Sequence, residues 1–179
     1  MALALGAMGW GSGFVFAQLG GETGNDSAKA MVGKAKAALK VGKLEMAFAW
    51  FMKAAKKENP EAQNMVGKCY ENGIGVREND MDAAVWYRKS AGYGYAEGQN
   101  NLGNCYLHGK GVRKDDQEAI KYYHKAASKG STAAAYNLGY CYETGYGLPR
   151  NSGMAKYFYH MAAAEGNTLA QSRLRQIER

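Results

Sequence analysis

The sequence predicts an all-α fold built from stacked antiparallel helix pairs. A 36-residue pattern recurs three times without a gap, apolar residues within each repeat follow helical spacing, and the 179-residue chain has 24 Gly but only 2 Pro. Proline breaks helices, so its scarcity favours a chain made almost wholly of helix. The apolar content of 46% and the aromatic content of 12% exclude a Gly-rich disordered chain.

The repeat is defined by nine positions that are identical in three consecutive blocks, 62–97, 98–133 and 134–169. In the first block these positions are Gly67, Cys69, Tyr70, Gly73, Gly75, Ala83, Tyr87, Ala91 and Gly94, and each recurs 36 residues later in the next block. A block of this size cannot bury its apolar face alone. Neighbouring blocks are therefore expected to stack into one continuous core.

Each block is predicted to form two helices, and the second block shows the pattern of both. Its first helix is expected near 99–107, where Leu102, Cys105 and Tyr106 form one apolar stripe at i, i+3 and i+4. Gly109 then stands where a left-handed glycine ends a helix. The second helix follows, with an apolar face built around Ala119.

Two further features of the block concern helix contacts and helix starts. A glycine inside the first helix, such as Gly103, costs helix propensity, so its recurrence predicts a close approach of two helices. Asp80, Asp116 and Ser152 are expected to cap the second helices of the three blocks.

The residues that carry the repeat also resemble a known family. The matching pattern is Leu102-Gly103-x-x-Tyr106-x-x-Gly109-x-Gly111-Val112, then Asp116, Ala119, Tyr122-Tyr123-x-Lys125-Ala126-Ala127 and Gly130. It is similar to the Sel1-like repeat, which is related to the tetratricopeptide repeat. The resemblance implies a right-handed α-solenoid that binds other proteins without catalysing a reaction. The third block departs from the pattern at Leu148-Pro149 and Ser152, in a loop and a cap.

The blocks are flanked on both sides. Residues 29–61 resemble a tetratricopeptide-type hairpin whose loop is about four residues shorter than in the later blocks, although Lys34 falls where an apolar residue is expected. Residues 170–179 are expected to form a polar capping helix, in which Arg175 replaces the packing glycine. The remaining segment, 1–28, is uncharged as far as Gly21.

The uncharged segment Met1–Gly21 has three interpretations. It can be a secretory signal peptide with small residues at Val15 and Ala17, a membrane anchor, or an apolar tail docked on a protein surface. A periplasmic, secreted or membrane-associated location in a bacterium is the expectation, with a cytoplasmic location as the alternative.

Reactive chemistry is not indicated by any motif. Cys69, Cys105 and Cys141 occupy one repeat position and are expected to be buried core thiols, because stacked repeats hold such sites too far apart for disulfides. They also lack the paired spacing of a zinc site. No nucleophile, general-acid or phosphate-loop pattern is present. We therefore expect no catalytic residues, no metal, no cofactor and no enzyme activity.

The family resemblance implies that the first helix of each pair lines a concave groove that binds a partner protein or peptide. The residues expected to face this groove are Asn64, Lys68, Glu71, Asn100, Asn104, His108, Tyr136, Tyr140 and Glu143. Their helical spacing places the members from each block on one face. The leading hypothesis is thus a non-catalytic interaction scaffold, whether it acts alone or as a subunit of a larger membrane-associated assembly.

An alternative function follows from charge. The net charge is +7, and the excess is concentrated between Lys29 and Lys57. Lys29, Lys36, Lys40 and Lys43 are expected on one face of a helix, forming a basic patch. This patch, within the Lys-rich hairpin 29–57, favours an electrostatic tether to an anionic membrane surface or nucleic acid, or docking to an acidic protein. Nucleic acid is the weakest of these partners, because Arg is scarce here and no nucleic-acid motif is present.

Overall fold

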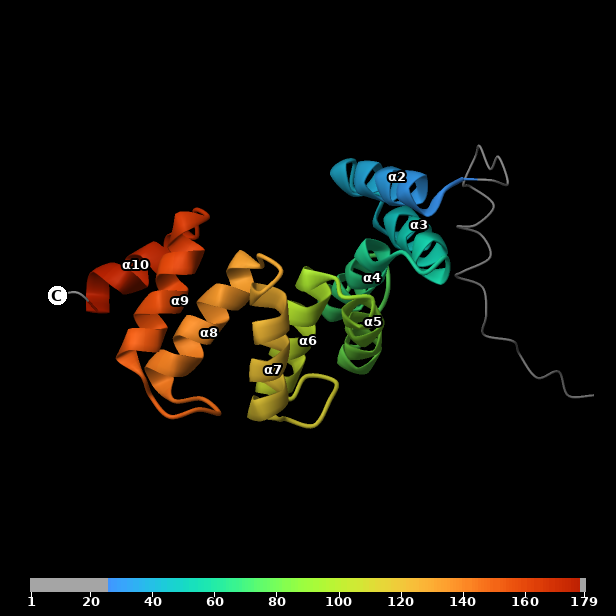
Figure 1. The fold of residues 1–179 in the computed structure, drawn as a ribbon. Coiled ribbons are helices and arrows are strands. Elements are labelled where there is room, and N and C mark those ends of the chain that lie inside the picture. Colours follow the sequence, from blue (N-terminus) through green and yellow to red (C-terminus); the bar gives the residue numbers. More distant parts are fainter. Residues whose placement is uncertain (1–25, 178–179) are drawn as a thin grey trace, which may run out of the picture.

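The computed structural model describes residues 26–177, and every regular element in that part of the chain is an α-helix. The helices are α2 (Ala28–Lys40), α3 (Leu44–Lys56), α4 (Pro60–Asn72), α5 (Asp80–Gly92), α6 (Ala96–His108), α7 (Asp116–Ala127), α8 (Thr132–Thr144), α9 (Ser152–Ala164) and α10 (Thr168–Ile177). They stack into an elongated row that runs from α2 to α10 (Figure 1). The predicted all-α solenoid is confirmed.

Consecutive helices pack as antiparallel pairs, α2/α3, α4/α5, α6/α7 and α8/α9, and α10 closes the row. The loop inside the first pair has three residues, 41–43, whereas the later loops, such as 73–79, have seven. The shorter loop expected for the N-terminal hairpin is therefore confirmed. The later pairs begin at Pro60, Ala96 and Thr132, two residues before the predicted block boundaries.

The second helices are capped one residue earlier than predicted. Asn79, Asp115 and Asn151 are the N-caps of α5, α7 and α9, and each side chain accepts hydrogen bonds from backbone N–H groups of the first turn. Asp80, Asp116 and Ser152, expected to be the caps, are instead the first helical residues. A carboxylate at that position still stabilises the positive end of the helix dipole.

Each of the three later helix pairs is held by a tyrosine ring packed on a glycine. A Cβ built on Gly67 would lie 2.6 Å from the Tyr87 ring, and Tyr123 approaches Gly103 equally closely. In the third repeat Tyr159 does the same on Gly139. The three rings are fully buried. The close helix approach predicted from the recurring glycine is confirmed, and the residue that requires it is the tyrosine.

Successive pairs are joined through the long loops. Gly75 and Gly111 adopt left-handed φ values of 68° and 66° and lie against the first turn of the preceding second helix. A Cβ on Gly75 would overlap the Leu44 carbonyl, and a Cβ on Gly111 would overlap the Asp80 carbonyl. These loop glycines therefore set the distance between neighbouring repeats.

The three cysteines lie in this core. Cys69, Cys105 and Cys141 are free thiols with 1%, 4% and 0% of their surface exposed. Burial raises the pKa of Cys69 and Cys141 to about 11 and that of Cys105 to about 12. They behave as small apolar core residues, as the sequence predicted.

Gly111→Ala is expected to destabilise the fold strongly. The new methyl group meets left-handed strain and overlaps the Asp80 carbonyl, which together cost about 3 kcal/mol of unfolding free energy in urea. Gly130→Ala is the matched control, because Gly130 has a φ of 84° but no neighbour within 4 Å. It should cost only about 1 kcal/mol. Equal losses in the two variants would contradict the role assigned to the loop contact.

The buried thiols should be unreactive in the native protein. At pH 8 a thiol-specific colorimetric reagent should label none of Cys69, Cys105 and Cys141, because burial and the raised pKa suppress the thiolate. All three should react together across the urea unfolding transition. Rapid labelling of any one of them without denaturant would show that its repeat opens locally.

Candidate functional site

The surface predicted to form the groove is carried by the first helices of the pairs, α4, α6 and α8. Among the described helices, α4 and α6 contact each other more than any other two that are not consecutive. Lys68, Asn104 and Tyr140 occupy one repeat position on α4, α6 and α8, and their side chains are exposed or half-buried. We call this surface the inner groove, after that prediction. Along its length the residue at this position changes from a charged lysine to an amide to an aromatic ring.

Two predicted groove residues lie beneath the surface. Asn64 and Asn100 are only 3% and 7% exposed. Asn101 donates to the Asn64 Oδ1 at 2.9 Å, and Asn137 donates to the Asn100 Oδ1 at 3.0 Å. Asn64 and Asn100 are therefore parts of a hydrogen-bonded asparagine ladder between neighbouring first helices. Their placement corrects the expectation that both face a partner.

The groove carboxylates are fixed by the tyrosines of the repeat. The Tyr87 hydroxyl donates to the Glu71 Oε2 at 2.6 Å, and the Tyr159 hydroxyl donates to the Glu143 Oε2 at 2.5 Å. Burial, followed by the acceptor carboxylate, raises the pKa of both hydroxyls, so both remain donors. Glu71 and Glu143 are thus held in one orientation at the groove surface.

The middle repeat uses a different acceptor. Leu107 occupies the position of Glu71 and Glu143, so no carboxylate is available there. The Tyr123 hydroxyl instead donates to the Asn104 Oδ1 at 2.7 Å, and Asn137 also donates to this oxygen at 3.2 Å. Asn104 is half-buried and fixed, whereas His108, one turn further along α6, is exposed.

The groove ends at an aromatic and arginine cluster. Arg173 of α10 lies 3.6 Å from a Glu143 oxygen and 5.9 Å from the centre of the Tyr140 ring. A hydrogen bond to Tyr136, followed by the charge of Glu143, raises the pKa of the guanidinium. The Tyr140 ring also stacks on Tyr146, with 6.1 Å between centroids. We call Tyr136, Tyr140, Glu143, Tyr146 and Arg173 the terminal cluster.

Arg173 was not recognised as a groove residue from the sequence, where it was assigned to the polar cap. Its spacing in the sequence could have identified it as a groove residue, because Arg173 stands 36 residues after Asn137 and 72 after Asn101. It therefore occupies the ladder position of the last repeat. There it reaches back to α8 as the ladder asparagines reach back to the preceding helix.

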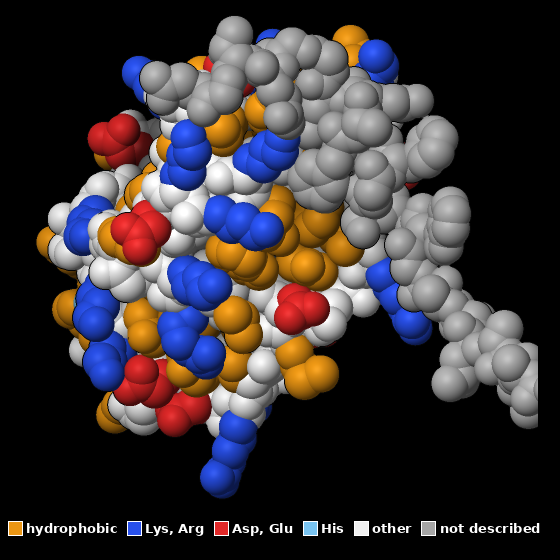
Figure 2. All heavy atoms as spheres, turned by 90° about the vertical axis from the view of Figure 1, so that its right-hand side faces the viewer, with side chains coloured by type: hydrophobic (Ala, Val, Ile, Leu, Met, Phe, Trp, Pro, Cys, Tyr) orange, Lys and Arg blue, Asp and Glu red, His pale blue; other side chains and the backbone are white. Residues whose placement is uncertain are grey.

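Only some of the lysines predicted to form the basic patch lie on one helix face. Lys29, Lys36 and Lys40 lie on α2, but Lys43 is the N-cap of α3 and does not share that helix face. Lys36 pairs with Glu61 at 2.5 Å, so its charge is partly neutralised. Lys29, Lys40 and Lys43 are exposed. Figure 2 shows Lys and Arg side chains scattered among hydrophobic ones on the side that carries this hairpin.

Lys34 explains the irregularity of the hairpin sequence. It stands where an apolar residue was expected, and its ammonium lies 4.6 Å from the centre of the Trp50 ring while pairing with Asp26 at 2.5 Å. The methylene stem of a lysine packs like an apolar side chain when its charged end finds such partners.

Neither metal binding nor membrane insertion is indicated by residues 26–177. No group of His, Cys, Asp and Glu in this range is arranged to hold a metal ion. No helix within it has the length and apolar character that crossing a bilayer requires. The segment Met1–Gly21, with its predicted signal or anchor function, lies outside the described residues.

Comparison with known proteins supports the repeat assignment. The Sel1 repeat family matches residues 36–59, 60–92, 96–131 and 132–167. No curated protein matches the chain.

Three solved structures illustrate the structural likeness. A Sel1 repeat protein from Oxalobacter formigenes is 31% identical with a TM-score of 0.77, over 83% of this chain and 62% of that one. The antigen c5321 of uropathogenic Escherichia coli is 32% identical with a TM-score of 0.70, over 84% of this chain and 36% of that one. Helicobacter pylori cysteine rich protein B is 25% identical with a TM-score of 0.57, over 69% of this chain and 94% of that one.

The chain thus spans less than two thirds of the first two of these proteins. The family matches cover most of residues 36–167. The fold of this family generally serves as a non-catalytic scaffold for protein interactions. The chain belongs to the Sel1 repeat family.

Proposed function

We propose that the chain is a non-catalytic scaffold whose inner groove binds an extended segment of a partner protein. The observation that carries this proposal is the terminal cluster. Tyr136, Tyr140 and Arg173 are half-buried, with part of each side chain left open to a partner. Tyrosine and arginine dominate the binding energy of protein interfaces, because they combine a large contact area with polar groups.

The fixed geometry of the groove supports the same proposal. Glu71, Asn104 and Glu143 each accept a hydrogen bond from a buried tyrosine, so their orientations are set before a partner arrives. Preorganised groups lose little conformational entropy on binding. The exposed side chains of Lys68 and His108 extend the contact surface along α4 and α6.

The composition of the groove suggests the kind of segment it takes. Tyr140 stacks on Tyr146 and lies beside the Arg173 guanidinium, which favours an apolar or aromatic anchor residue in the partner. Lys68 at the other end is exposed and favours an acidic residue. A peptide with an acidic end and an aromatic end is the partner that these two regions fit.

Export and membrane association remain proposals that rest on Met1–Gly21. Its uncharged, largely apolar sequence supports processing, anchoring or docking on a protein surface. An assembly at a membrane is compatible with a scaffold that binds through α4, α6 and α8, since that surface is separate from the N-terminal hairpin.

The alternative is an electrostatic tether through the N-terminal hairpin. Lys29, Lys40 and Lys43 are exposed and favour it. Against it, Lys34 and Lys36 are paired with Asp26 and Glu61. The groove is therefore the better supported of the two functions.

Tyr140→Ala should weaken peptide binding in the groove. Peptides selected from a random displayed library on the wild-type protein should lose about 2 kcal/mol, or roughly 30-fold in Kd, on this variant by titration calorimetry. The reason is the loss of the ring that stacks on Tyr146 and contacts Arg173.

Tyr157→Ala is the matched control for this experiment. Tyr157 is 56% exposed on α9 and is not part of the groove. Its removal should leave the Kd of the same peptides unchanged, and circular dichroism should show both variants folded. Selected peptides that ignore Tyr140→Ala, or respond equally to Tyr157→Ala, would refute groove binding.

The salt dependence of binding distinguishes groove binding from the electrostatic tether. Binding of a groove peptide should change little as salt rises through the physiological range, because contacts in the terminal cluster are largely aromatic. A tether to vesicles containing phosphatidylserine should instead be abolished, as exposed lysine charges are screened. Co-sedimentation that is abolished by the added salt, and is also lost when Lys29, Lys40 and Lys43 are all changed to Gln, would favour the tether.

A further inference from the structure

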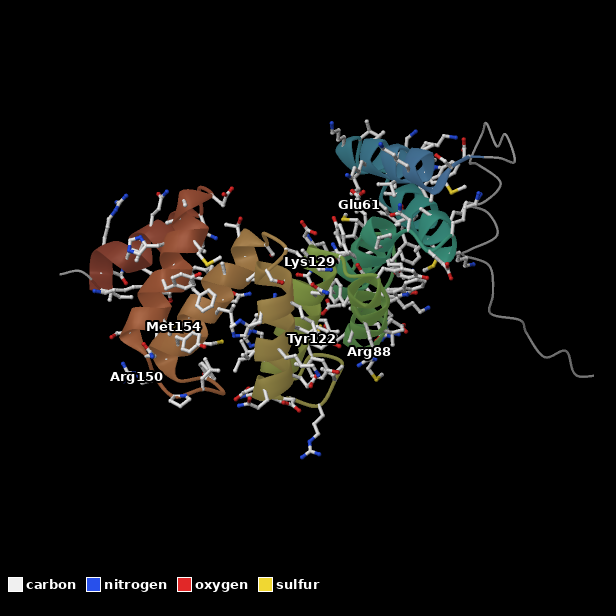
Figure 3. The ribbon with its side chains drawn as sticks, in the orientation of Figure 1. Glu61, Arg88, Tyr122, Lys129, Arg150 and Met154 are labelled. Atoms are coloured by element: carbon white, nitrogen blue, oxygen red, sulfur yellow. The ribbon has the colours of Figure 1, made fainter. Side chains whose placement is uncertain are left out.

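A second concave site lies away from the inner groove, between α5, α6 and α7. It is a surface pocket of about 470 Å³ at the junction of two repeats. Its lining includes Arg88, Gly94, Gln99, Tyr122, Lys125 and Lys129. Figure 3 labels Arg88, Tyr122 and Lys129 in the region between α5 and α7. We call this pocket the basic notch.

Three cations line the basic notch without a matching acid. Arg88, Lys125 and Lys129 come from α5, from α7 and from the turn after α7, and none of the lining residues is acidic. In the described part of the chain, none of the three forms an ion pair with a carboxylate. Like charges gathered in a concavity produce a positive potential that attracts anions.

The cationic groups are partly held in position. The Lys129 ammonium donates to the Gly94 carbonyl at 2.6 Å, which leaves its other two N–H bonds available. The Lys125 ammonium lies 5.2 Å from the centre of the Tyr122 ring. Tyr122 is in turn stacked on Tyr106, with 5.8 Å between centroids and 8° between planes. The notch therefore has one rigid aromatic wall.

The next repeat provides an internal comparison. A pocket of about 440 Å³ lies between α7, α8 and α9, and most of its lining residues stand 36 positions after lining residues of the notch. There Met161 replaces Lys125 and Glu165 replaces Lys129. His124 stands at the position of Arg88. The repeat architecture thus creates the concavity, but it does not require the positive charge.

The preceding repeat junction leads to the same conclusion. The residues 36 positions before Arg88, Lys125 and Lys129 are Met52, Lys89 and Tyr93. Among the three junctions compared within residues 26–177, the one around α6 alone combines three cations at these positions. The fold therefore does not require the three cations, which leaves them available to bind an anion.

We propose that the basic notch binds the phosphate group of a small phosphorylated molecule. Three positive groups match a doubly charged phosphate better than a single carboxylate, and the planar Arg88 guanidinium suits bidentate contact with phosphate oxygens. The volume of the notch falls within the range of small-molecule sites. The Tyr122 ring and the Gln99 amide would then contact whatever carries the phosphate.

This site is independent of the proposed groove function. The notch uses α5, α7 and the start of α6, whereas the groove uses the inner faces of α4, α6 and α8. Failure of peptide binding in the groove would leave the anion site untouched. Loss of the anion site would likewise leave the groove intact.

The test uses a variant taken from the protein's own next repeat. Arg88→His, Lys125→Met and Lys129→Glu together replace the three cations by the residues at the equivalent positions of the next repeat, which are already compatible with this fold. Titration calorimetry with inorganic pyrophosphate and with adenosine monophosphate should show saturable one-to-one binding to the full chain. The triple variant should weaken Kd at least about tenfold, because it removes every cation from the site.

The control changes charge by the same amount elsewhere. Lys29→His, Lys40→Met and Lys43→Glu alter exposed residues of the N-terminal hairpin and should change Kd less than about twofold.

In nuclear magnetic resonance spectra, the backbone amide signals of Gly92, Gly94 and Gln99 should shift when either ligand binds. Tighter binding of adenosine monophosphate would identify an organic phosphate as the ligand, and tighter binding of pyrophosphate would identify inorganic phosphates. The absence of saturable binding, or equal loss in the two triple variants, would overturn the proposal.

Discussion

The structure depends on one contact, the packing of a tyrosine ring directly on a helical glycine. In each of the three complete repeats the ring lies where any larger residue would place its Cβ, and the ring is fully buried. Gly103, for example, lets α6 approach α7 closely enough for Tyr123 to fit between them. Glycine weakens a helix by about 1 kcal/mol, a cost that burial of a whole aromatic ring offsets.

The same contact builds the functional surface. A tyrosine that crosses the pair above a glycine delivers its hydroxyl to the inner side, where Glu71, Asn104 or Glu143 accepts it. The asparagine ladder then ties neighbouring first helices together, and Arg173 ends it. Core packing and groove geometry are therefore one network. The glycine and the tyrosine of this network are the same in the three repeats, whereas the acceptor of the tyrosine hydroxyl and the lining of the repeat junctions differ.

Much of the fold followed from the sequence, because repetition exposes the constraints. Nine identical positions predicted the helix pairs, the close helix approach and the buried thiols, and the first loop was expected to be short. The helix caps were placed one residue late, because Asn79-Asp80 and Asp115-Asp116 each present two good capping residues in a row. Local sequence does not decide between adjacent cap candidates, since the choice depends on where the chain leaves the loop.

The candidate sites were less predictable. Helical spacing placed Asn64 and Asn100 on the groove face, but spacing does not report how far the next repeat covers that face. Only the stacked structure showed that Asn64 and Asn100 are buried and accept hydrogen bonds from Asn101 and Asn137. The basic notch likewise brings together Arg88 and Lys129, which are far apart in the chain and line one pocket because two repeats stack.

The sequence by itself determined the repeat and its core, since local periodicity encodes both. The tertiary structure decided which polar residues remain accessible, because accessibility depends on contacts between repeats.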